Sequence, residues 1–149
     1  MDELQELYRE VILDHNRRPR NFGELPDADK VVEGVNPLCG DRMTLYVKLR
    51  GDTVEDIRFK GTGCAISVAS SSLMTERVKG ASVEASLELF DKIHELLTDA
   101  NATPTDDLDK LAALAGVRAY PTRVKCASLG WHALKAALAG ADDRPVTTE

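Results

Sequence analysis

The sequence has no long run of hydrophobic residues, and its acidic residues outnumber its basic ones. A membrane-spanning helix requires about 20 consecutive apolar residues, and no segment of this 149-residue chain comes near that length. Its start, Met1 to Leu4, has neither the basic residues nor the apolar stretch of a signal peptide. With 25 acidic against 19 basic residues and a net charge of −6, the chain is a poor match for nucleic acid or an anionic membrane. We therefore expect a soluble, cytoplasmic protein whose partners are neither of these.

Cysteine is also scarce, with three residues, Cys39, Cys64 and Cys126, separated by 24 and 61 residues. In a reducing compartment, an odd number of widely spaced cysteines argues against a disulfide framework. The spacing matches no short zinc-finger pattern. The cysteines remain candidates for metal ligands, for nucleophiles or for buried apolar residues.

Hydrophobic periodicity predicts one helix, a β-hairpin and four further helices. Residues 3–17 repeat apolar side chains at helical spacing, and Pro19 follows the end of that stripe. Residues 43–49 and 54–59 alternate apolar and polar side chains around Gly51-Asp52, which predicts a hairpin with one bulge. A further strand is possible at residues 31–35. The other helices are expected at residues 64–79, 83–98, 108–114 and 122–139, the third of them ending at Gly116.

This order of elements predicts an α+β fold in which a small antiparallel sheet of about three strands is covered by helices. No linker is long enough to separate domains, so residues 1–140 are expected to form one domain. The segment from Thr98 to Asp107 is polar and contains Pro104, which indicates an exposed excursion. Residues 141–149 are rich in Asp, Pro and Thr, and we expect them to be disordered.

Each cysteine stands in a local context that is unusual for a core residue. Cys39 lies among the turn-forming residues of Asn36-Pro37-Leu38-Cys39-Gly40-Asp41, so Cys39 and Asp41 are expected on a loop. Cys64 follows Gly-Thr-Gly and would lie in the first turn of a helix, where the helix dipole favours a thiolate. Cys126 follows the cations Arg123 and Lys125, which favour a thiolate as well. Thiolate is the form that binds a metal or attacks an electrophilic sulfur.

These features predict one Zn²⁺ site made of the three cysteines with Asp41 as fourth ligand. Four negative ligands would leave the site with a net charge of about −2, which Arg42, Arg123 and Lys125 could offset. A carboxylate is a harder donor than a thiolate, so its presence favours a working site over a structural staple. The alternative for Asp41 is an Asx turn.

Five segments of the chain carry a resemblance to a known family. They are LYREVILDH (7–15), NPLCGDR (36–42), GTGCAIS (61–67), MTE (74–76) and RVKCA (123–127). With these motifs the chain closely resembles the U-type iron–sulfur cluster assembly proteins, the IscU/SufU-like family. Two features favour the SufU branch over the IscU scaffolds. One is an insertion at about residues 81–116, and the other is Lys125 where IscU-type proteins carry histidine. The Leu-Pro-Pro-Val-Lys segment of the IscU branch is missing.

The resemblance implies that Cys39, Asp41, Cys64 and Cys126 are zinc ligands, and that Cys39 accepts persulfide sulfur from a PLP-dependent cysteine desulfurase of the SUF type. Arg123 would support this site, and SUF scaffold proteins could act downstream. The chain would then be a sulfurtransferase that activates the desulfurase, with Cys39 as the ligand that leaves the metal. Two alternatives remain open: a scaffold for an iron–sulfur cluster, which the same ligands could hold, and a module whose zinc only stabilises the fold.

Overall fold

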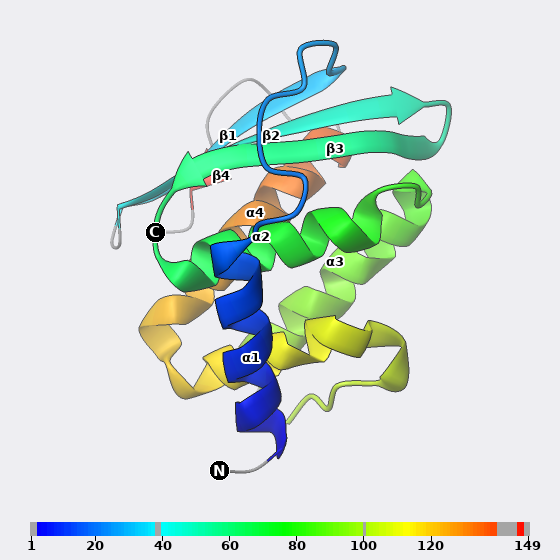
Figure 1. Ribbon diagram of the computed structural model, residues 1–149. Coiled ribbons are helices and arrows are strands. Elements are labelled where there is room, and N and C mark those ends of the chain that lie inside the picture. Colours follow the sequence, from blue (N-terminus) through cyan, green and yellow to red (C-terminus); the bar gives the residue numbers. More distant parts are fainter. Residues whose placement is uncertain (1–2, 38–39, 100, 140–145, 148–149) are drawn as a thin grey trace.

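The computed structural model describes residues 3–37, 40–99, 101–139 and 146–147, and these residues have the predicted α+β fold (Figure 1). In chain order the elements are α1 (Glu3–Arg17), β1 (Lys30–Asn36), β2 (Asp41–Arg50), β3 (Thr53–Thr62), α2 (Ala65–Val78), α3 (Val83–Thr98), the 3₁₀ helix η1 (Asp106–Ala119), α4 (Pro121–Ala139) and β4 (Val146–Thr147).

The sheet has the strand order β3-β2-β1-β4. Strands β1, β2 and β3 form the predicted antiparallel meander, and the slip in its hydrophobic alternation is absorbed by an irregularity between Lys48 and Leu49. Strand β4 adds two residues in parallel to β1. The prediction of a disordered tail mostly concerns residues outside the described part of the chain and stays a prediction, but Val146 and Thr147 pair with β1.

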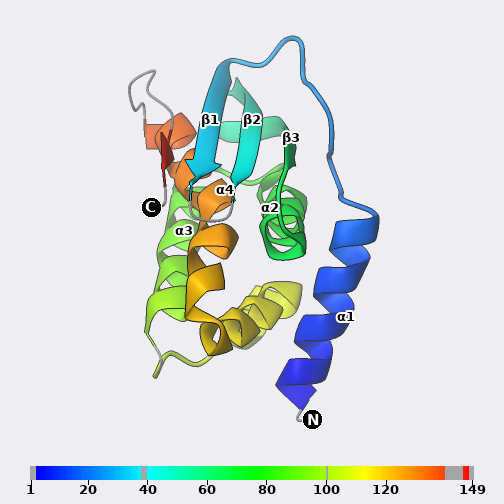
Figure 2. The same ribbon diagram turned by 90° about the vertical axis from the view of Figure 1, so that its left-hand side faces the viewer.

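One face of the sheet carries the apolar core. Leu45 and Val47 of β2 and Ile57 of β3 are fully buried, as the period-2 alternation of these strands requires. Helices α2 and α4 lie beneath this face, and α1 packs against α2 and η1 away from the sheet (Figure 2). The arrangement brings the ends of β2, α2 and α4 together.

Three local predictions need correction. Asp41 is the first residue of β2 rather than a loop residue, because it pairs with Asn36 across the β1–β2 ladder. Cys64 is the N-cap of α2, one residue before the helix. Gly116 lies inside η1 instead of ending a helix. A Cβ there would lie 2.7 Å from the ring of Tyr8, so this glycine permits the close packing of α1 on η1.

Helix α3 has the predicted bounds, since Ser82 caps it by accepting a hydrogen bond from the backbone N–H of Ala85 at 3.0 Å. Within the described ranges, no helix combines the length and the apolar character that crossing a bilayer requires.

Candidate metal centre

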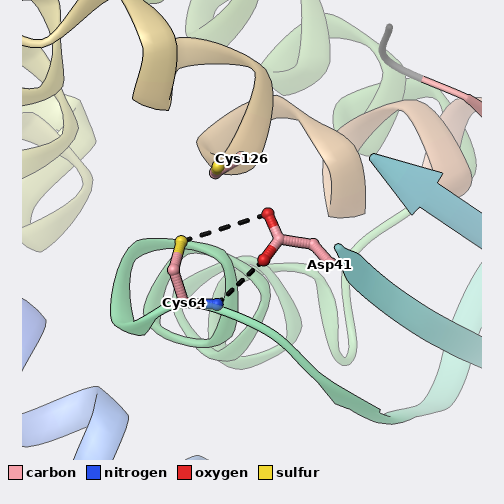
Figure 3. Close-up of side chains that lie close together, drawn as sticks. All are labelled: Asp41, Cys64 and Cys126. Atoms are coloured by element: carbon pink, nitrogen blue, oxygen red, sulfur yellow. Dashed lines mark hydrogen bonds between the residues drawn. The ribbon is translucent and has the colours of Figure 1, made fainter. Parts of the chain in front are cut away.

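Three predicted ligands from three separate elements come together beneath the sheet. Asp41 begins β2, Cys64 caps α2 and Cys126 lies near the start of α4 (Figure 3). One carboxylate oxygen and the two sulfur atoms all lie within 4.8 Å of one another. Asp41 and Cys126 are buried, whereas Cys64 is partly exposed, so the group has one side open to solvent.

Glycines at the end of β3 make room for this arrangement. A Cβ on Gly61 would lie 2.1 Å from the carbonyl oxygen of Arg42, so only glycine lets this end of β3 pair so closely with β2. A Cβ on Gly63 would lie 2.5 Å from Oδ1 of Asp41. The segment Gly-Thr-Gly therefore allows the carboxylate to reach the N-terminus of α2.

The two oxygens of Asp41 have different surroundings. Oδ1 accepts a hydrogen bond of 2.8 Å from the backbone N–H of Cys64. Oδ2 lies 4.0 Å from Cys64 Sγ and 3.4 Å from the side-chain nitrogen of Asn36. The first bond anchors the carboxylate to the start of α2, and this leaves Oδ2 facing the sulfur atoms as a candidate metal ligand.

The donor set fits a zinc ion. Tetrahedral zinc, with bonds of about 2.0 Å to oxygen and 2.3 Å to sulfur, separates an oxygen and a sulfur ligand by about 3.5 Å and two sulfurs by about 3.8 Å. The observed separations of up to 4.8 Å are wider by roughly 1 Å, a difference that small side-chain rotations can close. Cys64 Sγ also accepts a hydrogen bond of 3.4 Å from the backbone N–H of Ser67, which holds the sulfur at the N-cap of α2.

The prediction for Cys39 lies outside the described residues. The described neighbours on either side, Asn36 and Asp41, face each other in the β1–β2 ladder. The connection that contains Cys39 therefore begins beside Asp41, at Asn36, and ends at Asp41 itself.

Tyr8 of α1 interacts with Tyr120, Cys64 and Arg123. Arg123 and Lys125 are half-buried in the first turns of α4, and Arg42 is exposed on β2. The pKa of Tyr8 is raised first by burial, then by Tyr120 and by Cys64, while Arg123 lowers it. The rings of Tyr8 and Tyr120 stack with centroids 6.3 Å apart.

Two residues of the site were missed at the level of sequence. The sequence marks Asn36 only as a turn former, although its side chain donates to Asp41 and to Cys126 Sγ, the latter at 3.3 Å. The periodicity marks Tyr8 only as part of a helical stripe. Its place in a family motif was the one available signal. Histidine takes no part in the group of ligands among the described residues, since His15 is buried elsewhere and its Nδ1 bonds to Ser72 Oγ.

Comparisons with known proteins give sequence and structural relatives of this chain. The family model "NifU-like N terminal domain" matches residues 7–127. The chain is 45% identical over 136 residues to the zinc-dependent sulfurtransferase SufU of Bacillus subtilis, covering 91% of this chain and 92% of that protein. It is 43% identical over 138 residues to the iron–sulfur cluster assembly scaffold protein IscU of Streptococcus pyogenes serotype M1, covering 93% and 86%.

A solved structure shows the same fold. It is that of a protein from Fervidobacterium islandicum AW-1, proposed to be an iron–sulfur cluster assembly scaffold for the SUF system. The TM-score is 0.82 at 34% sequence identity, and the match covers 90% of this chain and 98% of that one.

Proposed function

Because this chain belongs to the NifU-like N-terminal domain family of iron–sulfur cluster assembly proteins, which includes IscU and SufU, we propose that it is a zinc-dependent sulfurtransferase. In this role it accepts persulfide sulfur on Cys39 from a SUF-type cysteine desulfurase in the cytoplasm and passes it to a downstream scaffold. The convergence of Asp41, Cys64 and Cys126 on one point supports the proposal most strongly.

Three of the four proposed ligands are fixed by helices or strands, and the fourth, Cys39, belongs to a short connection. Asp41, Cys64 and Cys126 are fixed by β2, α2 and α4. Covalent geometry keeps the Cα of Cys39 within about 7 Å of the Cα of Asp41, which is within reach of the metal for a cysteine side chain. Zinc, when bound, keeps its cysteine ligands as thiolates. We assign Cys39 as the ligand that leaves, with the other three retaining the metal.

The transfer itself is a thiol–persulfide exchange. The thiolate of Cys39 attacks the outer sulfur of the persulfide on the desulfurase. A new S–S bond forms to Cys39, the S–S bond of the donor breaks, and the desulfurase cysteine leaves as a thiolate. No net oxidation or reduction occurs. We assign to Arg123, which is half-buried at the start of α4 and acts on Tyr8, the role of a positive charge that stabilises the thiolates of this exchange.

Mass spectrometry of the protein after incubation with desulfurase and L-cysteine tests this function. We expect one added sulfur atom on the peptide that contains Cys39, and no such addition in Cys39→Ser. The transfer proposal fails if the added sulfur is found on Cys64 or Cys126 instead, or if Cys39→Ser carries as much sulfur as the wild type.

A scaffold function is the second candidate, because the relative from Streptococcus pyogenes is named a scaffold and the same four residues could hold an iron–sulfur cluster. Protein purified without oxygen separates the two functions. Zinc with a colourless protein supports sulfur transfer, whereas a brown protein containing iron and acid-labile sulfide supports the scaffold.

A further inference from the structure

The side chain of Asn36 links two of the candidate ligands. Asn36 is the last residue of β1 and is fully buried. Its amide nitrogen lies 3.3 Å from Cys126 Sγ and 3.4 Å from Asp41 Oδ2. Cys126 is 90 residues away in the sequence, so this one amide group connects the end of the β1–β2 ladder to α4.

Chemistry fixes the orientation of this amide. A carboxylate and a thiolate only accept hydrogen bonds, whereas the NH₂ group of asparagine offers two N–H donors. The reverse orientation would place the carbonyl oxygen of Asn36 against two anionic acceptors. With the NH₂ group toward the site, each N–H can face one ligand and offset part of its negative charge.

The other end of the amide shows that packing alone does not explain this residue. Oδ1 of Asn36 is buried and has no hydrogen-bond partner among the described residues. Buried polar atoms are nearly always paired, so an apolar side chain would fill this place at lower cost. The fold keeps an amide here, and its two described hydrogen bonds go to candidate metal ligands.

The position of Asn36 relates it to Cys39 as well. Asn36 and Asp41 are direct partners in the β1–β2 ladder, and residues 37–40 connect them. The hydrogen bond between these two side chains therefore holds the candidate ligand Asp41 in place where the connection that carries Cys39 ends.

We propose that Asn36 is a positioning residue that holds Asp41 and Cys126 in place as metal ligands. This second part rests on the proposed function: when Cys39 leaves the metal to accept sulfur, the same contacts keep Asp41 and Cys126 on the metal. Asn36 does not itself contact the metal or the transferred sulfur.

Zinc affinity of the purified protein, measured by competition with a chelating dye and without any desulfurase, tests the proposal. Removal of a partner that orients a metal ligand typically lowers metal affinity 10- to 100-fold, and we expect a loss of about this size for Asn36→Ala. Asn36→Asp keeps the size of the side chain but replaces the donor by a second carboxylate, beside that of Asp41 and the sulfur of Cys126. We expect its loss to be larger than that of Asn36→Ala.

Two further measurements separate positioning from general stability. Ser86→Ala is the matched control. Ser86 lies on α3 and is buried like Asn36, and its replacement removes one hydrogen bond, of 2.8 Å, to the carbonyl of Ser82. Its zinc affinity should equal that of the wild type. With Co²⁺ in place of zinc, the sulfur-to-cobalt absorption bands should shift in the Asn36 variants and remain unchanged in Ser86→Ala.

The order of the two Asn36 variants is decisive. A residue that only fills space would give the opposite order, with Asn36→Asp near wild type and Asn36→Ala impaired, and that result would overturn the proposal. If Asn36→Ala does not fold, Asn36→Asp decides alone: wild-type affinity refutes positioning, and a loss of tenfold or more supports it. The zinc affinities are measured without desulfurase. They therefore test the role of Asn36 even if the proposed sulfur transfer to Cys39 is wrong.

Discussion

Replacement of Gly63 by alanine tests whether the carboxylate of Asp41 is part of the metal centre. The φ angle of Gly63 is not among the positive values of this chain, so alanine meets no backbone strain there, and the obstacle is Oδ1 of Asp41. The new Cβ would lie 2.5 Å from this oxygen, whereas ordinary contacts begin at 3.4 Å. The carboxylate must therefore move by about 0.9 Å, the distance that restores van der Waals contact.

That movement breaks a specific bond. The hydrogen bond from Cys64 N–H to Oδ1 measures 2.8 Å, and a shift of this size stretches it beyond bonding distance. Hydrogen bonds to charged groups contribute about 1.5–3 kcal/mol, so we expect the metal-free protein to lose about that much free energy of unfolding. Displacing Oδ2 together with Oδ1 should also lower the zinc affinity about 10- to 100-fold.

A double-mutant cycle gives the control. In an Asp41→Ala background the clashing carboxylate is absent and only the milder 3.2 Å contact with the Cβ of residue 41 remains, so adding Gly63→Ala should change the urea midpoint and the zinc affinity far less. Both quantities are measured on the four proteins of the cycle. Equal effects of Gly63→Ala in the two backgrounds would refute the reasoning, because the alanine would then act independently of the carboxylate.

Two further predictions concern buried polar groups that are not candidate ligands. Ser70 Oγ donates to the carbonyl of Ala127 at 2.6 Å and accepts from Trp131 Nε1 at 3.1 Å. Ser70→Ala leaves both groups buried and unpaired and should cost about 1–3 kcal/mol in urea unfolding, so an unchanged midpoint would contradict this role. Burial first, and then the charge of Arg20, lower the pKa of His15 below 6.5. The unfolded chain then binds a proton more readily than the folded one, so the free energy of unfolding should fall as pH decreases below 6.5. In metal-free protein His15→Asn should flatten this pH dependence, and equal slopes for the two proteins would show that His15 does not cause it.

Local sequence signals were sufficient for most of the fold. The bounds of α3 follow from Ser82, whose hydroxyl caps the helix, and those of α1 from its apolar stripe and the proline beyond it. The helix end predicted at Gly116 was wrong because a glycine in a helical pattern can have two causes. It can end the helix, or it can admit a neighbour, here the ring of Tyr8. Only the packing of α1 on η1 distinguishes them.

Local sequence signals indicate some residues of the candidate site, and only tertiary contacts reveal the others. Asp41 and Cys64 could be singled out because glycines and turn formers surround them, and Cys126 because cations precede it. Asn36 could not, since its significance depends on a contact with Cys126 on a distant helix. The loop predicted for Asp41 was wrong because strand pairing with Asn36 overrides the turn propensity of the segment.

The cysteine-consuming rate of the desulfurase, measured together with the zinc content of the added protein, tests the central claim most directly. Wild type and Cys39→Ser are compared at equal concentration. The account predicts that Cys39→Ser retains zinc through Asp41, Cys64 and Cys126 but no longer raises the rate of the desulfurase. If Cys39→Ser stimulates the desulfurase as strongly as the wild type, then Cys39 is not the acceptor and the account is contradicted.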